Sequence, residues 1–110
     1  MLDSQTAVLE KNTVLSGTFA TEPFEVAWAR EARWFFQVLE ATGDPSVELS
    51  TQISPDGLNW IDLDADRIQA AADGITSWSV REFGHWLRVR GTIGSADATV
   101  KVRIYLVLKS

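Results

Sequence analysis

Two-residue alternation of apolar and polar side chains is the feature of this sequence that most limits its fold. It is longest at residues 100–109, where Val100, Val102, Ile104, Leu106 and Leu108 alternate with Lys101, Arg103, Tyr105, Val107 and Lys109. Successive side chains of a β-strand point to opposite faces, so the pattern predicts a strand with one buried face. Residues 46–53 and 86–93 alternate similarly. Residues 33–41 are apolar on both faces at first, which predicts a strand covered on both sides.

Turn-forming residues separate these runs, at 22–23, 43–45, 55–57, 73–74 and 94–97. Many short strands divided by such turns favour an all-β fold, an antiparallel β-sandwich of jelly-roll or immunoglobulin-like kind with seven to nine strands. Only residues 64–72 contain a run of good helix formers, so we expect at most one short helix there; a strand or an irregular crossing fits equally. The 110 residues contain no linker or repeat and are expected to form a single domain, 1–110.

The composition limits the function classes. The chain has no cysteine, which excludes disulfides and thiolate metal sites. Its net charge of −5 argues against general nucleic-acid binding. The first residues lack a basic segment followed by an apolar run, and no apolar stretch approaches the ~18 residues of a membrane span. We therefore expect no signal peptide, no transmembrane segment and no membrane partner, and a protein made inside a cell.

Residues 53–60, ISPDGLNW, combine turn-forming residues with a tryptophan. Pro55 and Asp56 suit the two central positions of a type I turn, and Gly57 accepts the left-handed conformation that follows. This predicts a three-residue hairpin with a bulge. Asp56, Asn59 and Trp60 are the candidates for contacting a ligand at the loop tip, with core or edge packing as the other role for Trp60.

The segment SPDGLNW resembles the Ser-x-Asp-Gly-x-x-Trp hairpin of small phage virion structural proteins of the decoration or accessory type. The resemblance extends over residues 34–108 and includes the final long strand. It implies a β-sandwich, a structural role without catalysis, a capsid or other protein assembly as partner, and a location in a virion or the host cytoplasm. The same hairpin, with HWLRVRG at residues 85–91, also resembles discoidin-like carbohydrate-binding domains, which implies sugar binding as an alternative.

Catalytic and metal-binding patterns are weak. By parity, the single histidine, His85, shares the core-facing side with Leu87 and Val89, and no acid near it in sequence is placed to orient it as a base. We expect no enzyme activity and no cofactor. The spacing of Asp62, Asp64 and Asp66 is similar to that of the first ligands in a calcium-binding loop. The sixth position of that loop is arginine instead of glycine, so a polar turn is favoured over a calcium site.

The basic residues are concentrated near the end of the chain. Residues 85–110 contain five Lys and Arg against one Asp, which gives +4 and leaves −9 for residues 1–84. The short turn at 94–97 predicts that strands 85–93 and 98–109 pair as a hairpin. One outward face would then carry the candidate protein interface: Trp86, Arg88, Arg90, Lys101, Arg103 and Tyr105. The alternative is that these cations are simply solvated or paired with carboxylates within the chain.

Five tryptophans are many for this length. Trp28 and Trp78 lie on apolar faces and are expected in the core, whereas Trp86 is expected to face outward among arginines. Exposed aromatic side chains serve protein interfaces and also stack on sugars.

Together these patterns predict a structural protein that forms a homo-oligomer or binds a protein lattice, as a capsid decoration or tail accessory subunit. The alternatives are a carbohydrate-binding module that uses exposed tryptophans, and an interaction domain of a cellular protein shell.

Overall fold

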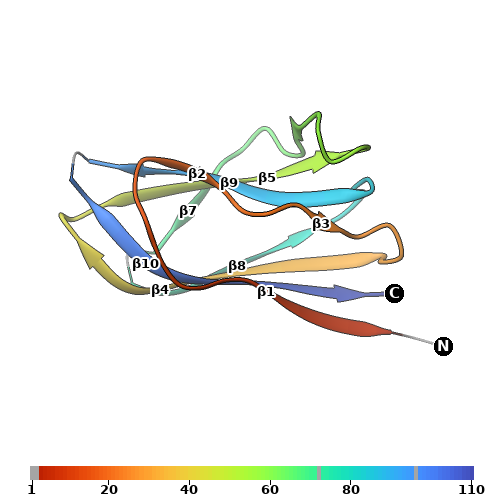
Figure 1. The fold of residues 1–110 in the computed structure, drawn as a ribbon, viewed down its shortest axis with the longest axis horizontal. Coiled ribbons are helices and arrows are strands. Elements are labelled where there is room, and N and C mark those ends of the chain that lie inside the picture. The colour runs from red at the N-terminus through yellow and green to blue at the C-terminus, as the bar shows by residue number, and fades with distance from the viewer. Residues whose placement is uncertain (1–2, 72, 96) are drawn as a thin grey trace.

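The computed structural model describes residues 3–71, 73–95 and 97–110. The strands in this part of the chain are β1 (Ser4–Leu15), β2 (Thr18–Ala20), β3 (Phe24–Glu25), β4 (Glu31–Thr42), β5 (Ser46–Ser54), β6 (Ile61–Asp62), β7 (Ile68–Ala70), β8 (Gly74–Val80), β9 (Trp86–Gly94) and β10 (Thr99–Lys109). They form two antiparallel sheets that stack face to face (Figure 1). The predicted all-β sandwich is confirmed. The ten strands exceed the expected seven to nine because four of them have only two or three residues.

The strand order is that of a jelly roll. Sheet A has the order β1-β10-β4-β8, and sheet B has the order β2-β9-β5-β6, with β3 also pairing β9 and β7 also pairing β5. Counting β2 with β3 and β6 with β7 as interrupted strands reduces ten strands to eight, ordered 1-8-3-6 and 2-7-4-5. The chain thus crosses repeatedly between the sheets, as two Greek keys require. In the immunoglobulin arrangement the first two strands share a sheet, which β1 and β2 do not.

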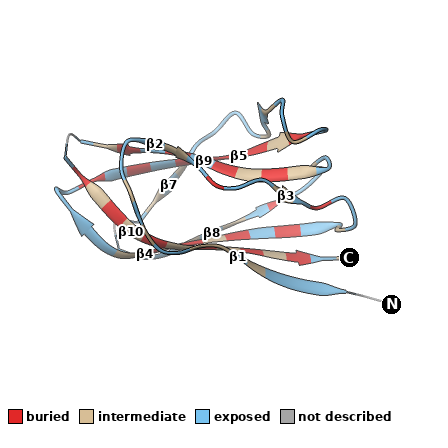
Figure 2. Ribbon diagram, in the orientation of Figure 1, coloured by how far each residue is buried: buried red, intermediate tan, exposed pale blue. Residues whose placement is uncertain are grey.

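The core lies between the two sheets, where buried residues from both inner faces meet (Figure 2). The alternating residues of β10 are fully buried: Val100, Val102, Ile104, Leu106 and Leu108. They face Leu49, Leu87 and Val89 of sheet B, which are also fully buried. The alternation in the sequence therefore reports which side of each strand faces the opposite sheet.

The outer side of β4 departs from expectation. Trp34, Phe36 and Val38 are buried, but Phe35 and Leu39 on the other side are only half-buried. In the described part of the chain, sheet A packs against sheet B on one side only. The prediction that this strand is covered on both sides is wrong, and an apolar strip remains on the surface.

Residues 64–72 contain no helix among those the structure describes; β7 occupies part of this segment. Ile68 packs against the core, and β7 pairs with β5 from Ile68 to Ala70. Packing of one apolar side chain at a sheet edge outweighs the helix propensity of so short a run. No helix in the described residues has the length and apolar character needed to cross a membrane.

Two residues expected to face the core are exposed. Trp28 is 40% exposed because β3 ends at Glu25 and the following turn, closed by a bond from Ala29 N–H to the Val26 carbonyl, breaks the alternation. His85 lies before the start of β9, so strand parity does not apply to it. Its Nε2 lies 3.5 Å from a carboxylate oxygen of Glu25, and both side chains are about half exposed.

Candidate protein interface

The structure separates the two halves of the predicted interface. β9 lies in sheet B and β10 in sheet A, so the turn between them crosses the sandwich instead of closing a hairpin. Arg88 and Arg90 point outward from sheet B, whereas Lys101, Arg103 and Tyr105 point outward from sheet A, on the opposite side of the molecule. The predicted hairpin and its single basic face are therefore wrong.

On sheet B, the predicted residues Arg88 and Trp86 make contacts within the protein. The guanidinium carbon of Arg88 lies 4.3 Å from the ring centroid of Trp60. Arg88 Nε also donates to Gln52 Oε1 at 2.7 Å, and burial, together with the charge of Arg90, lowers the pKa of Arg88. Trp86 is half-buried against Gly57, where an added Cβ would lie 3.4 Å from the indole ring. These contacts stabilise a corner of the sandwich and leave little of Trp60 free.

A polar network continues from this corner. Gln52 Nε2 donates to Asp62 Oδ1 at 3.0 Å, and Arg67 lies 3.9 Å from the other Asp62 oxygen. Arg67 also donates to Ser50 Oγ at 3.4 Å. The network borders a small polar hollow of about 320 Å³, which is lined by Thr18, Glu48, Gln52, Asp62, Arg67, Arg90 and Thr92. Asp62 is thus committed to internal partners.

The three aspartates of the calcium alternative do not come together as ligands. Asp62 bonds to Gln52, and Asp64 and Asp66 are exposed in the loop that follows β6. Across the described residues, no three His, Cys, Asp or Glu side chains are grouped so that they could hold a metal ion.

The loop after β5 is wider than predicted. The register pairs Ile53 with Ile61, so seven residues intervene where a three-residue hairpin was expected. Ser54 Oγ accepts from Gly57 N–H at 2.8 Å, and Gly57 has the expected positive φ of 80°. Asp56 Oδ1 accepts from the backbone N–H groups of Leu58 and Asn59, both at 2.9 Å. The aspartate side chain thereby holds a broader loop than the turn residues alone would specify.

The hydrogen bonds to Asp56 predict an acid-sensitive loop. The N–H of Asn59, then that of Leu58 and the Asn59 side chain, hold the pKa of Asp56 well below its usual value of 3.8. A lowered folded-state pKa gives stabilisation that is complete above the unfolded-state pKa and is lost as pH falls through the folded-state pKa. We expect Asp56→Asn to flatten the part of the melting-temperature profile below about pH 4. Calorimetry of both proteins from pH 6 to pH 2 measures this, with Asp64→Asn as the control; equal profiles would contradict it.

The outer face of sheet A carries the apolar surface that sequence reasoning missed. We call the outward-pointing residues of β1, β10, β4 and β8 face A. The register places Val8, Tyr105 and Phe35 in one row across three strands. On the same face, Val8 is 53%, Val14 62% and Ile75 59% exposed. The register sets Val14 opposite Lys101, four β10 residues from the partner of Val8. Only the tertiary fold brings these strands together, so no single strand of the sequence indicates the shared surface.

Face A is also basic. Its outward-pointing charged residues are Lys11, Arg33, Lys101, Arg103 and Lys109 against Glu31 and Glu40, which gives five minus two, or +3. Glu10 of β1 is not counted, because the register sets it opposite the inward-facing Ile104. Since the chain carries −5, the remainder carries −8. Lys11 lies directly opposite Arg103, an arrangement that destabilises a sheet unless an opposite charge approaches.

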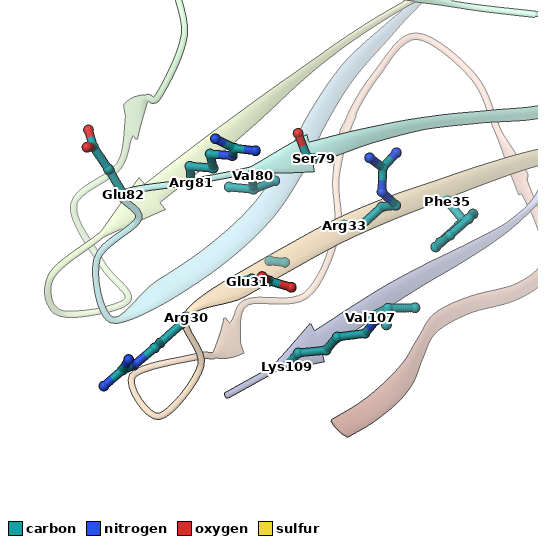
Figure 3. Close-up of a pocket in the computed structure, with 11 residues that line it drawn as sticks. Arg30, Glu31, Arg33, Phe35, Ser79, Val80, Arg81, Glu82, Val107 and Lys109 are labelled. Atoms are coloured by element: carbon teal, nitrogen blue, oxygen red, sulfur yellow. The ribbon is translucent and has the colours of Figure 1, made fainter. Parts of the chain in front are cut away.

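One end of face A is hollowed into an open groove of about 660 Å³ (Figure 3). It runs over the start of β4 and the ends of β8 and β10. Its charged lining residues are Arg30, Arg33, Arg81 and Lys109 with Glu31 and Glu82, and Phe35 and Val107 contribute apolar surface. Arg33 is held in place by a 3.0 Å bond from its Nη1 to Ser77 Oγ.

Comparison with known proteins gives a likeness of fold. No family model matches the chain, and no curated protein matches it by sequence. The crystal structure of the SPBc2 prophage-derived protein YomS matches with a TM-score of 0.64 and 15% sequence identity, over 100% of this chain and 96% of that chain. At this identity the match shows that the two proteins share a fold over their whole length.

Proposed function

We propose that the protein is a structural subunit without enzymatic activity that binds other proteins through face A. The observation that supports this proposal best is that face A combines exposed valine and isoleucine and half-buried aromatic side chains with a net charge of +3, on a chain that is otherwise acidic. An exposed apolar surface ringed by charge is typical of protein contact sites. The fitting partner is an acidic protein surface, because it would neutralise the facing cations Lys11 and Arg103.

We further propose that the assembly is a phage-like virion, with the protein as a capsid decoration or tail accessory subunit. Two observations support this. The fold matches that of a prophage-derived protein over the full length, and jelly rolls are common in viral capsid domains. The test is to purify particles from the host cell on a density gradient and probe them for the protein. Its absence from every particle fraction would contradict the virion proposal.

Binding through face A gives a specific expectation. Arg103→Glu should weaken association with the purified particles at least about tenfold, because arginine and aromatic residues at the centre of an interface contribute most to affinity. Arg90→Glu makes the same charge change on sheet B and is the matched control. Cosedimentation at low salt measures both. Equal weakening by the two variants would show that net charge, not face A, determines binding.

The carbohydrate-binding alternative has less support from the geometry. Arg88 covers one face of Trp60, and Trp86 packs against Gly57, so each indole has at most one face left for stacking on a sugar ring. A glycan array discriminates the two functions. Clear binding that is abolished by Trp86→Ala would favour sugar recognition over a structural role.

A further inference from the structure

The four sheet edges of the sandwich differ in how well they resist pairing with another strand. β1 has two register shifts along its length, between Val8 and Glu10 and between Lys11 and Thr13. Such bulges, together with the charged residues Glu10 and Lys11 on β1, protect an edge strand against pairing with another chain. Both edges of sheet B are built from strands of two or three residues, which are too short to serve as a template.

β8 has none of these protections. It pairs with β4 over seven residues without a register shift. Its sequence, GITSWSV, contains no charge and no proline. Ile75 on this strand is 59% exposed. In the described part of the chain, no backbone–backbone hydrogen bond reaches β8 from its free side. The preceding loop bonds to the strand through the Ala71 N–H, which donates to the Thr76 side chain at 2.9 Å. A regular, uncharged edge strand of this length is a ready site for adding a further strand.

The charges at the ends of β8 select the direction of pairing. Asp73 precedes the strand, and the groove at its far end is lined by four cations and two carboxylates, or +2. An antiparallel neighbour with the same sequence places its own Asp73 beside this basic end, and the two-fold axis repeats the contact. A parallel neighbour would place like ends together. The complementarity therefore favours a second copy of this chain, antiparallel.

We propose that the protein dimerises by antiparallel pairing of β8 with β8 of a second copy, with the two-fold axis at Ser77. Residues whose numbers sum to 154 then face each other, so Ile75 lies opposite Ser79 of the second copy. No two like charges oppose each other within the paired strands. The two sheets A join into one continuous sheet, which extends face A across both copies. The biological role of the dimer rests on the proposed structural function, whereas the evidence for the dimer comes from the edge strand itself.

Cysteine crosslinking tests the pairing and its register. The chain has no cysteine, so Ser77→Cys introduces a single thiol at the axis. Directly opposed residues have Cβ atoms about 5 Å apart, within reach of a short bis-maleimide. In Ser79→Cys, the two thiols lie four strand residues apart, or about 13 Å. We expect rapid dimer formation with Ser77→Cys and at least about tenfold slower crosslinking with Ser79→Cys. Equal rates, or no crosslinked dimer from either variant, would overturn the proposal.

Charge reversal provides an independent measurement. Asp73→Lys should raise the dimer dissociation constant about tenfold at low salt, because the two-fold axis places the substituted residue at both ends of the paired strands. Asp64→Lys makes the same change in the loop after β6 and should leave the constant within about twofold. Sedimentation equilibrium of the pure proteins measures both, and a wild-type monomer at all concentrations would overturn the dimer. Particle association is measured separately, so failure of the dimer and failure of the proposed function are distinguishable.

Discussion

Trp34→Ala is expected to lower the free energy of unfolding by about 3–5 kcal/mol, the range for removing a large aromatic side chain from a core. Trp34 is fully buried in β4 and packs 6.5 Å, centroid to centroid, from Trp78. Its removal leaves a cavity that two hydrogen-bonded sheets cannot close. Since small domains are stable by about 5–15 kcal/mol, a loss of this size is a large part of the total. Urea unfolding followed by fluorescence measures it.

Trp28→Ala is the matched control for this substitution. It removes the same atoms at a position that is 40% exposed, so we expect less than half the loss. Trp34→Phe adds a second comparison. Trp34 Nε1 is buried and has no hydrogen-bond partner among the described residues, so phenylalanine also removes an unsatisfied donor. Trp34→Phe should therefore cost clearly less than Trp34→Ala. Equal losses at positions 28 and 34 would contradict the burial that the structure assigns.

Gly91→Val is expected to lower the free energy of unfolding by about 3 kcal/mol, at the upper end of the range for overpacking. Gly91 lies on the inner face of β9, between Phe19 of β2 and Leu49 of β5. A Cβ at this position would lie 2.6 Å from Phe19 Cζ and 2.7 Å from Leu49 Cδ2. The two neighbours already fill the space, so the added side chain forces the sheet or Phe19 to move.

Two further variants make the explanation testable by thermal unfolding. Gly84→Ala is the control, because its Cβ would meet Ser54 only at an ordinary 3.5 Å and we expect little change. Phe19→Leu in the Gly91→Val background should recover part of the loss by removing the closest atom. A double-mutant cycle then gives a favourable coupling between positions 19 and 91. Strictly additive effects would show that the cost arises elsewhere.

The candidate site illustrates how far local patterns reach. Parity correctly placed Arg88, Arg90, Lys101 and Arg103 on the outward sides of their strands. It could not show that the two strands lie in different sheets, because the short turn between them is compatible both with a hairpin and with a crossing of the sandwich. The residues of the predicted interface therefore lie on two different sheets. Val8, Lys11 and Arg33 were not predicted, because their strands join face A only through long-range pairing.

The loop that contains SPDGLNW shows the same division at a smaller scale. The left-handed conformation of Gly57 followed from the residue type. The width of the loop did not, because it depends on where β6 pairs with β5 and on the bonds that Asp56 makes to Leu58 and Asn59. Trp60 packs against Arg88, which lies 28 residues later in the chain, so its position also depends on the tertiary fold.

The sequence by itself determined the class of fold and the buried side of β5, β9 and β10, because both depend on a two-residue period that these strands carry locally. It also marked five of the turns between strands, but not those at 16–17, 26–30 and 81–85. Only the tertiary structure decided which strands are neighbours, which edges stay open and which charges share a surface. Those properties depend on pairing between distant segments such as β1 and β10, whose register joins Ser4 to Lys109. The free energy of such pairing comes from the packing of two whole sheets, and no short stretch of residues contains it.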